Sequence, residues 1–339
     1  MEEKVLVTGA SGFIAAHCII KLLDYGYTVK GTVRDFSKIN SLKEMFGRYT
    51  VNTDKLSFVK ANLLEDEGWL EATSDCDYVL HVASPVPIKL PKDENDIIRP
   101  AKEGTLRVLR AAVSNQVKRI VLTSSIAAIC YGHKSTGQVF TEKDWSDVYG
   151  EGVVAYPKSK TLAEKAAWEF MKSQGGSTEM VALNPSVVLG PALEKDYGSS
   201  LEIIKKILAG DLPGAPKIAW PVVDVRDVAE MHILAMKASD VDGERFICAG
   251  ETLSIIDIAR ILRDHFPKYK KKIPRKTLPN WLVRLSAIFD SSVKSVITEL
   301  GKPQYVSSEK ARNLLGWQPR SAEEAIVDGA KSLIAYKII

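Results

Sequence analysis

Tyr156 and Lys160 are the residues whose types and spacing point most directly to chemistry. They lie four positions apart in a strongly helical stretch, so both side chains can project from one helix face toward a single site. A tyrosine hydroxyl has a pKa of about 10, which is too high for ready proton exchange at neutral pH. A nearby ammonium stabilises the phenolate and lowers that pKa, so the pair could deliver a proton to a substrate. Of the eleven tyrosines, only Tyr156 has a lysine at the fourth following position, although a coincidence of this kind is expected by chance.

Ser125 supplies a further hydroxyl. The strand-like run before it ends at Thr123 and Ser124, which places Ser125 at the carboxyl edge of the expected sheet. Doubly wound folds bind their ligands at this edge. A serine there can donate to a substrate carbonyl oxygen and hold it beside the tyrosine hydroxyl, whereas a serine taken alone is more often a turn cap. We predict that Ser125, Tyr156 and Lys160 are the catalytic residues.

The chain opens with a strand-like run at residues 5–7 that leads through two glycines into a helical stretch. Glycines in such a turn let backbone N–H groups approach a pyrophosphate, and the helix N-terminus adds partial positive charge. An ordinary strand–helix turn could show the same glycines. Because this turn begins an alternating α/β pattern, we predict a dinucleotide-binding loop. Its expected cofactor contacts are Gly9, Ser11, Gly12, Phe13 and Ile14.

The end of the second strand-like run indicates which nucleotide is bound. Arg34 lies at the turn and Lys38 follows four residues later, and two cations there favour the 2′-phosphate of NADP. Asp35 could instead accept hydrogen bonds from the ribose of NAD, but a helix N-terminal role suits it better. We therefore predict NADPH/NADP+ as the cofactor and leave open whether Asp35 also allows NADH.

The elements that must position these residues alternate between short apolar runs and helical stretches. This alternation predicts a parallel sheet with helices on both faces. Strands are expected at residues 5–7, 28–33, 56–59, 78–82, 119–122 and 180–183, and helices at 12–24, 38–46, 97–114 and 156–174. After Pro185 the chain becomes richer in proline, with helices near 201–209, 225–238 and 254–265. We predict a nucleotide-binding domain at residues 1–185 and a smaller α/β substrate lobe at 186–339, with segments near 222–250 returning to the first domain.

The glycine loop, then Ser125, then Tyr156 with Lys160 occur in an order that resembles the extended short-chain dehydrogenases/reductases. The loop has the spacing Gly-x-x-Gly-x-x-Ala, preceded by Thr8. More narrowly, the chain resembles the group that contains dihydroflavonol reductase, cinnamoyl-CoA reductase and yeast methylglyoxal (carbonyl) reductase. The supporting segments are residues 32–35, 79–85, 163–170, 184–185 and 223–229, together with Glu142 and Trp145. The resemblance implies a Rossmann-type doubly wound fold.

The resemblance also implies further cofactor contacts. Asn62 and Leu63 would meet the adenine, although the family often has Asp where this chain has Asn62. Val82, Ala83 and Ser84 would line the path from adenosine to nicotinamide, and Thr123 would adjoin it. Pro185, Val188 and Ser200 would border the nicotinamide, with Tyr156 and Lys160 on the ribose side.

Two departures from the group narrow the expected substrate. Dihydroflavonol reductases usually carry Asn five residues after the catalytic Ser, where this chain has Cys130. Cinnamoyl-CoA reductases carry an Asn-Trp-Tyr-Cys-Tyr signature into the catalytic Tyr, where this chain has Val153, Val154 and Ala155. Both departures favour a general carbonyl reductase.

Composition excludes several other classes of protein. The 339 residues include 46 Lys and Arg against 42 Asp and Glu, a net charge of +4 that is too small to indicate nucleic-acid binding. No apolar run is long enough to span a membrane. The four cysteines and five histidines show no metal-ligand spacing, so no metal is expected and His81 is interpreted as structural. Isolated thiols and a strand-like run at the N-terminus favour a cytoplasmic protein without a signal peptide.

These observations predict an NADPH-dependent reductase of a small-molecule aldehyde or ketone. Two alternatives stay open. One is a nucleotide-sugar epimerase or dehydratase of the same superfamily, against which Arg34 and Lys38 argue. The other is a non-catalytic, nucleotide-sensing protein, against which the presence of both Tyr156 and Lys160 argues. The sequence leaves a monomer and a homodimer equally open and does not identify the carbonyl substrate.

Overall fold

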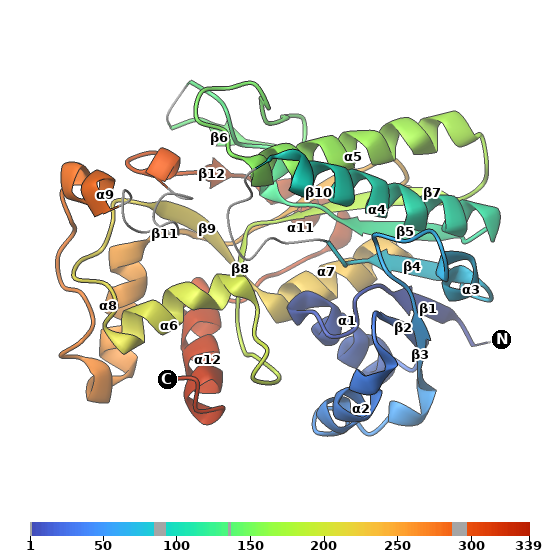
Figure 1. The fold of residues 1–339 in the computed structure, drawn as a ribbon, viewed down its shortest axis with the longest axis horizontal. Coiled ribbons are helices and arrows are strands. Elements are labelled where there is room, and N and C mark those ends of the chain that lie inside the picture. The colour runs from blue at the N-terminus through green and yellow to red at the C-terminus, as the bar shows by residue number, and fades with distance from the viewer. Residues whose placement is uncertain (1, 85–92, 135–136, 287–296) are drawn as a thin grey trace.

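The computed structural model describes residues 2–84, 93–134, 137–286 and 297–339. Its centre is a seven-stranded sheet with the order β10-β7-β5-β4-β1-β2-β3, in which every neighbouring pair is parallel (Figure 1). The strands are β1 (Lys4–Val7), β2 (Thr28–Val33), β3 (Leu56–Lys60), β4 (Tyr78–His81), β5 (Arg119–Thr123), β7 (Glu179–Pro185) and β10 (Arg245–Cys248). The predicted Rossmann-type sheet is confirmed.

Helices cover both faces of this sheet because successive strand residues point to opposite sides. In β1, Val5 and Val7 join the core on one face, while Leu6 joins the core on the other. The first face carries α1 (Phe13–Asp24), α2 (Ile39–Gly47), α7 (Val225–Lys237) and α11 (Glu309–Leu315). The second face carries α3 (Trp69–Thr73), α4 (Asn95–Ser114) and α5 (Ala155–Gln174), with α4 and α5 side by side (Figure 1).

The C-terminal part of the chain builds a second, smaller core. A three-stranded sheet contains β8 (Val187–Leu189), β9 (Ala219–Asp224) and β11 (Thr252–Ser254), and it packs with α6 (Glu202–Ala209), α8 (Ile255–His265), α9 (Asn280–Ser286) and α12 (Ala322–Ala335). A two-stranded sheet joins β6 (Val139–Phe140) to β12 (Tyr305–Val306). Short 3-10 turns are η1 (Phe36–Lys38), η2 (Thr53–Lys55), η3 (Ile126–Ala128), η4 (Ser199–Leu201), η5 (Pro267–Tyr269) and η6 (Ile297–Glu299). The domain division at residue 185 stays a prediction. Two segments after residue 185 belong to the central sheet region: β10 is one of its strands, and α7 packs on one of its faces.

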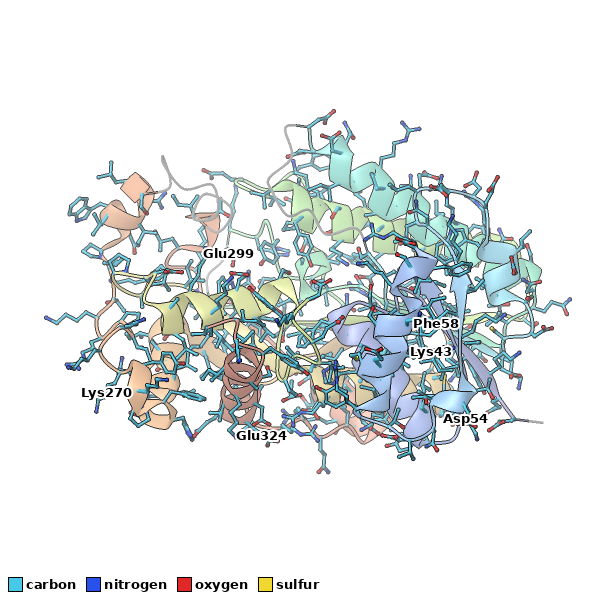
Figure 2. All side chains as sticks on the ribbon, turned by 60° about the horizontal axis from the view of Figure 1, so that its bottom comes forward. Lys43, Asp54, Phe58, Lys270, Glu299 and Glu324 are labelled. Atoms are coloured by element: carbon cyan, nitrogen blue, oxygen red, sulfur yellow. The ribbon has the colours of Figure 1, made fainter. Side chains whose placement is uncertain are left out.

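The two cores lie toward opposite ends of the molecule. Figure 2 shows Lys270, beside η5, at one end, and Asp54 of η2 with Phe58 of β3 at the other. Among the described residues, no helix is both long enough and apolar enough to cross a membrane.

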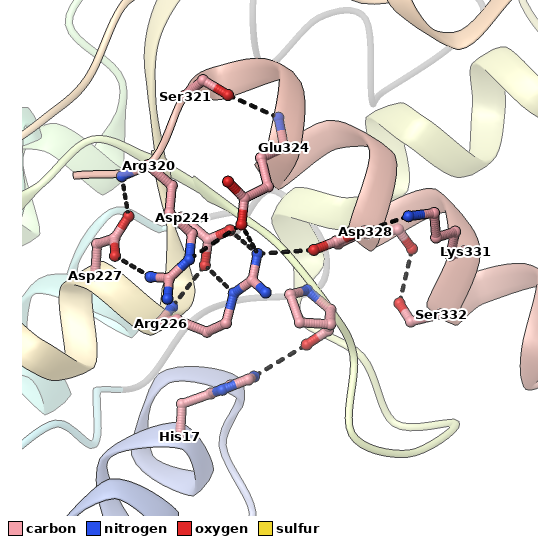
Figure 3. A network of polar contacts seen from close by, with 12 residues as sticks. His17, Asp224, Arg226, Asp227, Arg320, Ser321, Glu324, Asp328, Lys331 and Ser332 are labelled. Atoms are coloured by element: carbon pink, nitrogen blue, oxygen red, sulfur yellow. Dashed lines mark hydrogen bonds and ion pairs between the residues drawn. The ribbon is translucent and has the colours of Figure 1, made fainter. Parts of the chain in front are cut away.

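A network of ion pairs joins the start of α7 to α12 (Figure 3). The Asp224 carboxylate is fully buried, caps α7 by accepting from the Arg226 amide at 2.8 Å, and accepts two further hydrogen bonds from the Arg226 guanidinium. The same guanidinium reaches Asp328 at 2.9 Å and Glu324 at 3.5 Å on α12. Nearby, the backbone amide of Arg320 donates to the Asp227 carboxylate at 2.6 Å. Arg226 therefore forms ion pairs both with the buried Asp224 carboxylate and with helix α12.

We predict that Arg226→Met lowers the free energy of unfolding by about 3 kcal/mol, because it leaves the buried Asp224 carboxylate without its cation. Lys331→Met is the matched control, since Lys331 pairs with the same Asp328 from an exposed position and should cost less than about 1 kcal/mol. Urea unfolding followed by circular dichroism measures both. Equal losses for the two variants would contradict a special role for Arg226.

Candidate active site

The site lies where the strand order reverses, between β1 and β4, as expected for a doubly wound sheet. Gly9 follows β1 with a φ of +73°, a left-handed conformation that side chains rarely adopt. A Cβ added at Gly9 would lie 3.0 Å from the Ala83 Cβ, and the Gly12 amide donates to the Gly9 carbonyl at 2.8 Å. The loop is therefore a tight turn that only glycine fits at position 9.

The N-terminus of α1 offers unpaired amides to an anion. Gly12 is the N-cap residue and has no side chain to cap the helix, so the first-turn amides of Phe13 and Ile14 face outward without an intrahelical acceptor. Gly198, just before η4, packs so closely on the Phe13 ring that an added Cβ would lie 2.7 Å from it. This contact brings the η4 segment to the same helix end. The turn and the free amides suit a dinucleotide pyrophosphate.

Arg34 and Lys38 are exposed beyond the end of β2, and neither makes an ion pair within the described part of the chain. Asp35 between them accepts from the Ser37 amide at 2.9 Å and from the Ser37 hydroxyl at 2.6 Å. These hydrogen bonds to Ser37 lower the pKa of the Asp35 carboxyl and start η1, so the predicted helix at 38–46 begins instead as a 3-10 turn followed by α2. The interpretation of Asp35 as a helix N-terminal residue is confirmed. The two cations remain available for a ligand phosphate.

The predicted adenine contacts follow β3. The Asn62 amide nitrogen donates to Glu65 at 2.8 Å, and the Asn62 amide oxygen accepts from the Leu64 backbone at 3.2 Å. Leu63 packs against Gly104 of α4, where an added Cβ would lie 2.9 Å from the Leu63 Cβ. Asn62 thus stabilises its own turn, and an adenine contact by its side chain stays a prediction.

Thr8 joins the glycine loop to the segment after β4. Its hydroxyl oxygen accepts from the Ala83 amide at 2.9 Å and lies 2.9 Å from the His81 Nδ1 atom. Burial, helped by the positive charge of Lys160, lowers the pKa of His81 to about 3. His81 is therefore neutral at physiological pH and acts as a packing and hydrogen-bonding residue. Val82, Ala83 and Ser84 are half-buried beside the loop, where a cofactor could contact them.

Ser125 and Tyr156 meet at the carboxyl edge of the sheet. Ser125 follows β5 and caps η3 by accepting from the Ala127 amide at 3.1 Å, and its hydroxyl lies 3.5 Å from the Pro185 carbonyl oxygen. Tyr156 is the second residue of α5 and is 36% exposed. Burial of its hydroxyl end raises the pKa of Tyr156, and a hydrogen bond with the Ser125 side chain opposes that rise. The two predicted catalytic hydroxyls therefore lie near each other at this edge.

Lys160 lies one turn further along α5, and its ammonium is 6.0 Å from the centre of the Tyr156 ring. Its side chain is buried, and no hydrogen bond or ion pair from it reaches a described residue. Desolvation lowers the pKa of Lys160 to about 8, and the negative charge of Glu164 partly offsets this. The ammonium is thus held near the tyrosine with its donors free.

The remaining predicted residues line the other side of the edge. The Ser200 hydroxyl donates to the Val188 carbonyl, and Pro185 is buried at the end of β7. The Thr123 hydroxyl lies 2.7 Å from His232 Nε2, while His232 Nδ1 donates to the Val228 carbonyl at 2.8 Å. The Thr123 side chain is therefore directed to α7. Contacts of Thr123, Pro185, Val188 and Ser200 with a cofactor stay predictions.

Glu164 is the residue of this site that the sequence reasoning missed. It lies one helical turn after Lys160 and is fully buried. Its carboxylate accepts from Arg245 Nε at 2.6 Å, from the Asn184 amide at 2.8 Å and from the Ser124 hydroxyl. The same Asn184 amide donates to the Ser125 carbonyl at 3.1 Å. The signal available in the sequence was an acidic residue on the same helix face as Tyr156 and Lys160.

Comparisons with known proteins agree with this geometry. Residues 5–249 match the NAD dependent epimerase/dehydratase family. Cinnamoyl-CoA reductase CAD2 of Medicago truncatula is 37% identical over 80% of this chain and 83% of its own length. Cinnamoyl-CoA reductase 1 of Arabidopsis thaliana is 34% identical over 98% of this chain and 89% of its own. Yeast methylglyoxal/isovaleraldehyde reductase Gre2, solved with NADPH, covers 98% of this chain and 99% of its own, with a TM-score of 0.82 and 28% identity.

No group of His, Cys, Asp or Glu side chains among the described residues is arranged to hold a metal ion. The glycine turn, the nearness of Ser125 and Tyr156, and the similarity over nearly the whole chain agree with one another. The chain belongs to the NAD dependent epimerase/dehydratase family, in its extended short-chain dehydrogenase/reductase branch.

Proposed function

We propose that this protein reduces an aldehyde or ketone to an alcohol with NADPH. The nearness of the Ser125 and Tyr156 side chains at the carboxyl edge of the sheet supports the proposal, because two such donors could serve one carbonyl oxygen. Arg34 and Lys38 support NADPH over NADH, since both cations are free of ion pairs among the described residues. The relatives named cinnamoyl-CoA reductase and the NADPH-bound Gre2 structure support the same cofactor and reaction type.

Each predicted catalytic residue has a task in this reaction. The bound cofactor supplies a hydride to the carbonyl carbon. Ser125 donates a hydrogen bond to the carbonyl oxygen and holds it beside Tyr156, which delivers the proton. Lys160, with its donors free, binds the nicotinamide ribose and favours loss of the tyrosine proton. Its pKa of about 8 leaves it mainly charged at neutral pH.

The second candidate function is a nucleotide-sugar epimerase or dehydratase, which the name of the matching family allows. Such enzymes usually retain NAD, and the free cations Arg34 and Lys38 favour the phosphorylated nucleotide instead. A purely nucleotide-sensing protein has no need of the buried Lys160 beside Tyr156. Among reductases, Val153 and Val154 before Tyr156 still argue against a cinnamoyl-CoA substrate, so we propose a small, general carbonyl compound.

We further propose a cytoplasmic location and a monomer or homodimer. All four cysteines, Cys18, Cys76, Cys130 and Cys248, are free and buried, which suits a reducing compartment. Measuring NADPH oxidation against a panel of ketones, aldehydes, keto esters and nucleotide sugars tests the reaction. Oxidation with carbonyl compounds alone supports the reductase, and turnover of nucleotide sugars alone contradicts it.

We predict that Tyr156→Phe lowers kcat by a factor on the order of 10² to 10⁴, because the proton donor is lost while the ring is kept. NADPH affinity should stay within about twofold of the wild type. Tyr149→Phe is the matched control, because Tyr149 is 94% exposed and should leave kcat unchanged. A Tyr156→Phe enzyme that turns over at the wild-type rate on every substrate would remove Tyr156 as the acid.

We predict that Arg34→Ala raises the KM for NADPH by about ten- to a hundredfold and changes the KM for NADH little. Only NADPH loses a charge-assisted hydrogen bond to its 2′-phosphate, which is worth roughly 1.5–3 kcal/mol. Arg110→Ala, on the exposed face of α4, is the control for the loss of one positive charge. Steady-state kinetics measure the KM of the variant for each nucleotide relative to the wild type. Equal increases in the KM for NADPH and for NADH would exclude the phosphate contact.

We predict that NADPH binding weakens by about tenfold as the pH rises through about 8, because Lys160 then loses its charge. Below that pH the ammonium is present, so affinity should be constant down to pH 7. Lys160→Met should bind weakly and show no such transition, whereas Lys172→Met on the same helix should titrate like the wild type. Fluorescence titration of NADPH between pH 7 and pH 9.5 measures this. A transition that survives in Lys160→Met would assign it to another group.

A further inference from the structure

A small cavity is lined by residues from 130–140 and 151–153 on one side and from 298–304 on the other. Its volume is about 70 Å³, and its lining includes Tyr131, Val153, Glu299, Lys302 and Gln304. Tyr131 lies shortly after η3, which Ser125 caps, and Val153 lies just before the helix α5 that carries Tyr156. Val153 precedes Tyr156 by three residues, so their Cα atoms are at most about 11 Å apart. Burial raises the pKa of Tyr131, with smaller contributions from Glu299, Cys130 and Tyr156, and a hydrogen bond with the Gln304 side chain opposes the rise.

The inner wall of the cavity presents hydrogen-bond acceptors. The Glu299 carboxylate accepts from the Tyr131 hydroxyl at 3.3 Å and from the Trp220 indole, and it keeps further acceptor capacity. Gln304 is only 9% exposed, and its amide oxygen Oε1 has no hydrogen-bond partner among the described residues. An unpaired buried acceptor is costly, so a native structure usually supplies it with a donor. Gln304 is also one of the residues that line the cavity.

We propose that this cavity binds a hydroxyl group at the end of the substrate remote from its carbonyl, with Gln304 and Glu299 accepting its hydrogen bonds. The inference rests on the proposed reductase function, because it places the reacting carbonyl at Ser125 and Tyr156. The substrate class is then a carbonyl compound that carries a distal alcohol.

The charges and the size of the cavity favour a neutral hydroxyl over other groups. A carboxylate would be repelled by Glu299 and by Glu151, both of which line the cavity. An ammonium would be attracted by these carboxylates, but it would be repelled by Lys302 and would lose its hydration on entry. A methyl group would leave Gln304 Oε1 unpaired. The volume of about 70 Å³ exceeds the roughly 10–15 Å³ that one water molecule needs on this measure, so a small terminal group such as a hydroxymethyl can enter.

Two matched ketones test the proposal on the wild-type protein loaded with NADP+. In 8-hydroxyoctan-2-one a hydroxyl takes the place of the terminal methyl group of nonan-2-one. Isothermal titration calorimetry should give a Kd at least tenfold lower for the hydroxy ketone. An apolar cavity would give the opposite order, since nonan-2-one is the more hydrophobic ligand. Equal affinities, or tighter binding of nonan-2-one, would overturn the proposal.

The variant Gln304→Met keeps the side-chain length and removes the unpaired acceptor. It should abolish the preference for the hydroxy ketone and leave the Kd of nonan-2-one within about twofold of the wild type. A preference that survives in this variant would also overturn the assignment of Gln304. NADPH oxidation with both ketones is measured in parallel. A binding preference without oxidation would support the hydroxyl-binding cavity and contradict the reductase function. Oxidation of both ketones without a preference would support the reductase function and contradict the hydroxyl-binding cavity.

Discussion

The buried carboxylate of Glu164 is the constraint on which the arrangement of the site depends. A carboxylate without solvent contact is tolerated only when cations and donors surround it. Glu164 meets this need with Arg245 from β10, Asn184 from β7 and Ser124 at the end of β5. Helix α5 is therefore fixed against the carboxyl ends of β5 and β7 and against the first residue of β10. Tyr156 and Lys160, two turns and one turn earlier on that helix, are oriented by the same contacts.

Arg245 extends this constraint beyond the sheet. Its guanidinium lies 3.8 Å from the centre of the Trp145 ring and donates to the carbonyl oxygens of Glu142 and Asp144, each at 2.8 Å. The loop between β6 and α5, which ends at the catalytic helix, is thereby tied to the same ion pair. The interior end of the site is thus held together by one buried ion pair and the hydrogen bonds around it. Its outer end, at Arg34 and Lys38, keeps its charges exposed, as recognition of a phosphate in water requires.

Local patterns in the sequence were enough to predict the sheet, the glycine turn and the helix that carries Tyr156 and Lys160. These features depend on periodicity, on the conformational freedom of Gly9 and on spacings within one or two helical turns. The helical role of Asp35 followed in the same way, because its partner Ser37 is two residues away. The start of α2 was wrong by one residue, since the bond to Ser37 begins a 3-10 turn before the α-helix.

The sequence by itself determined the parallel α/β class, the nucleotide loop and the order of Ser125, Tyr156 and Lys160, because each is encoded by neighbouring residues. Only the tertiary structure decided which polar groups are buried together. Glu164 and Arg245 are 81 residues apart, and Tyr131 and Glu299 are 168 apart. No periodicity spans such separations, and each of these residues read alone resembles an ordinary surface charge or a packed aromatic. Their roles arise from burial, which removes water and makes the nearest donor or acceptor the one available partner.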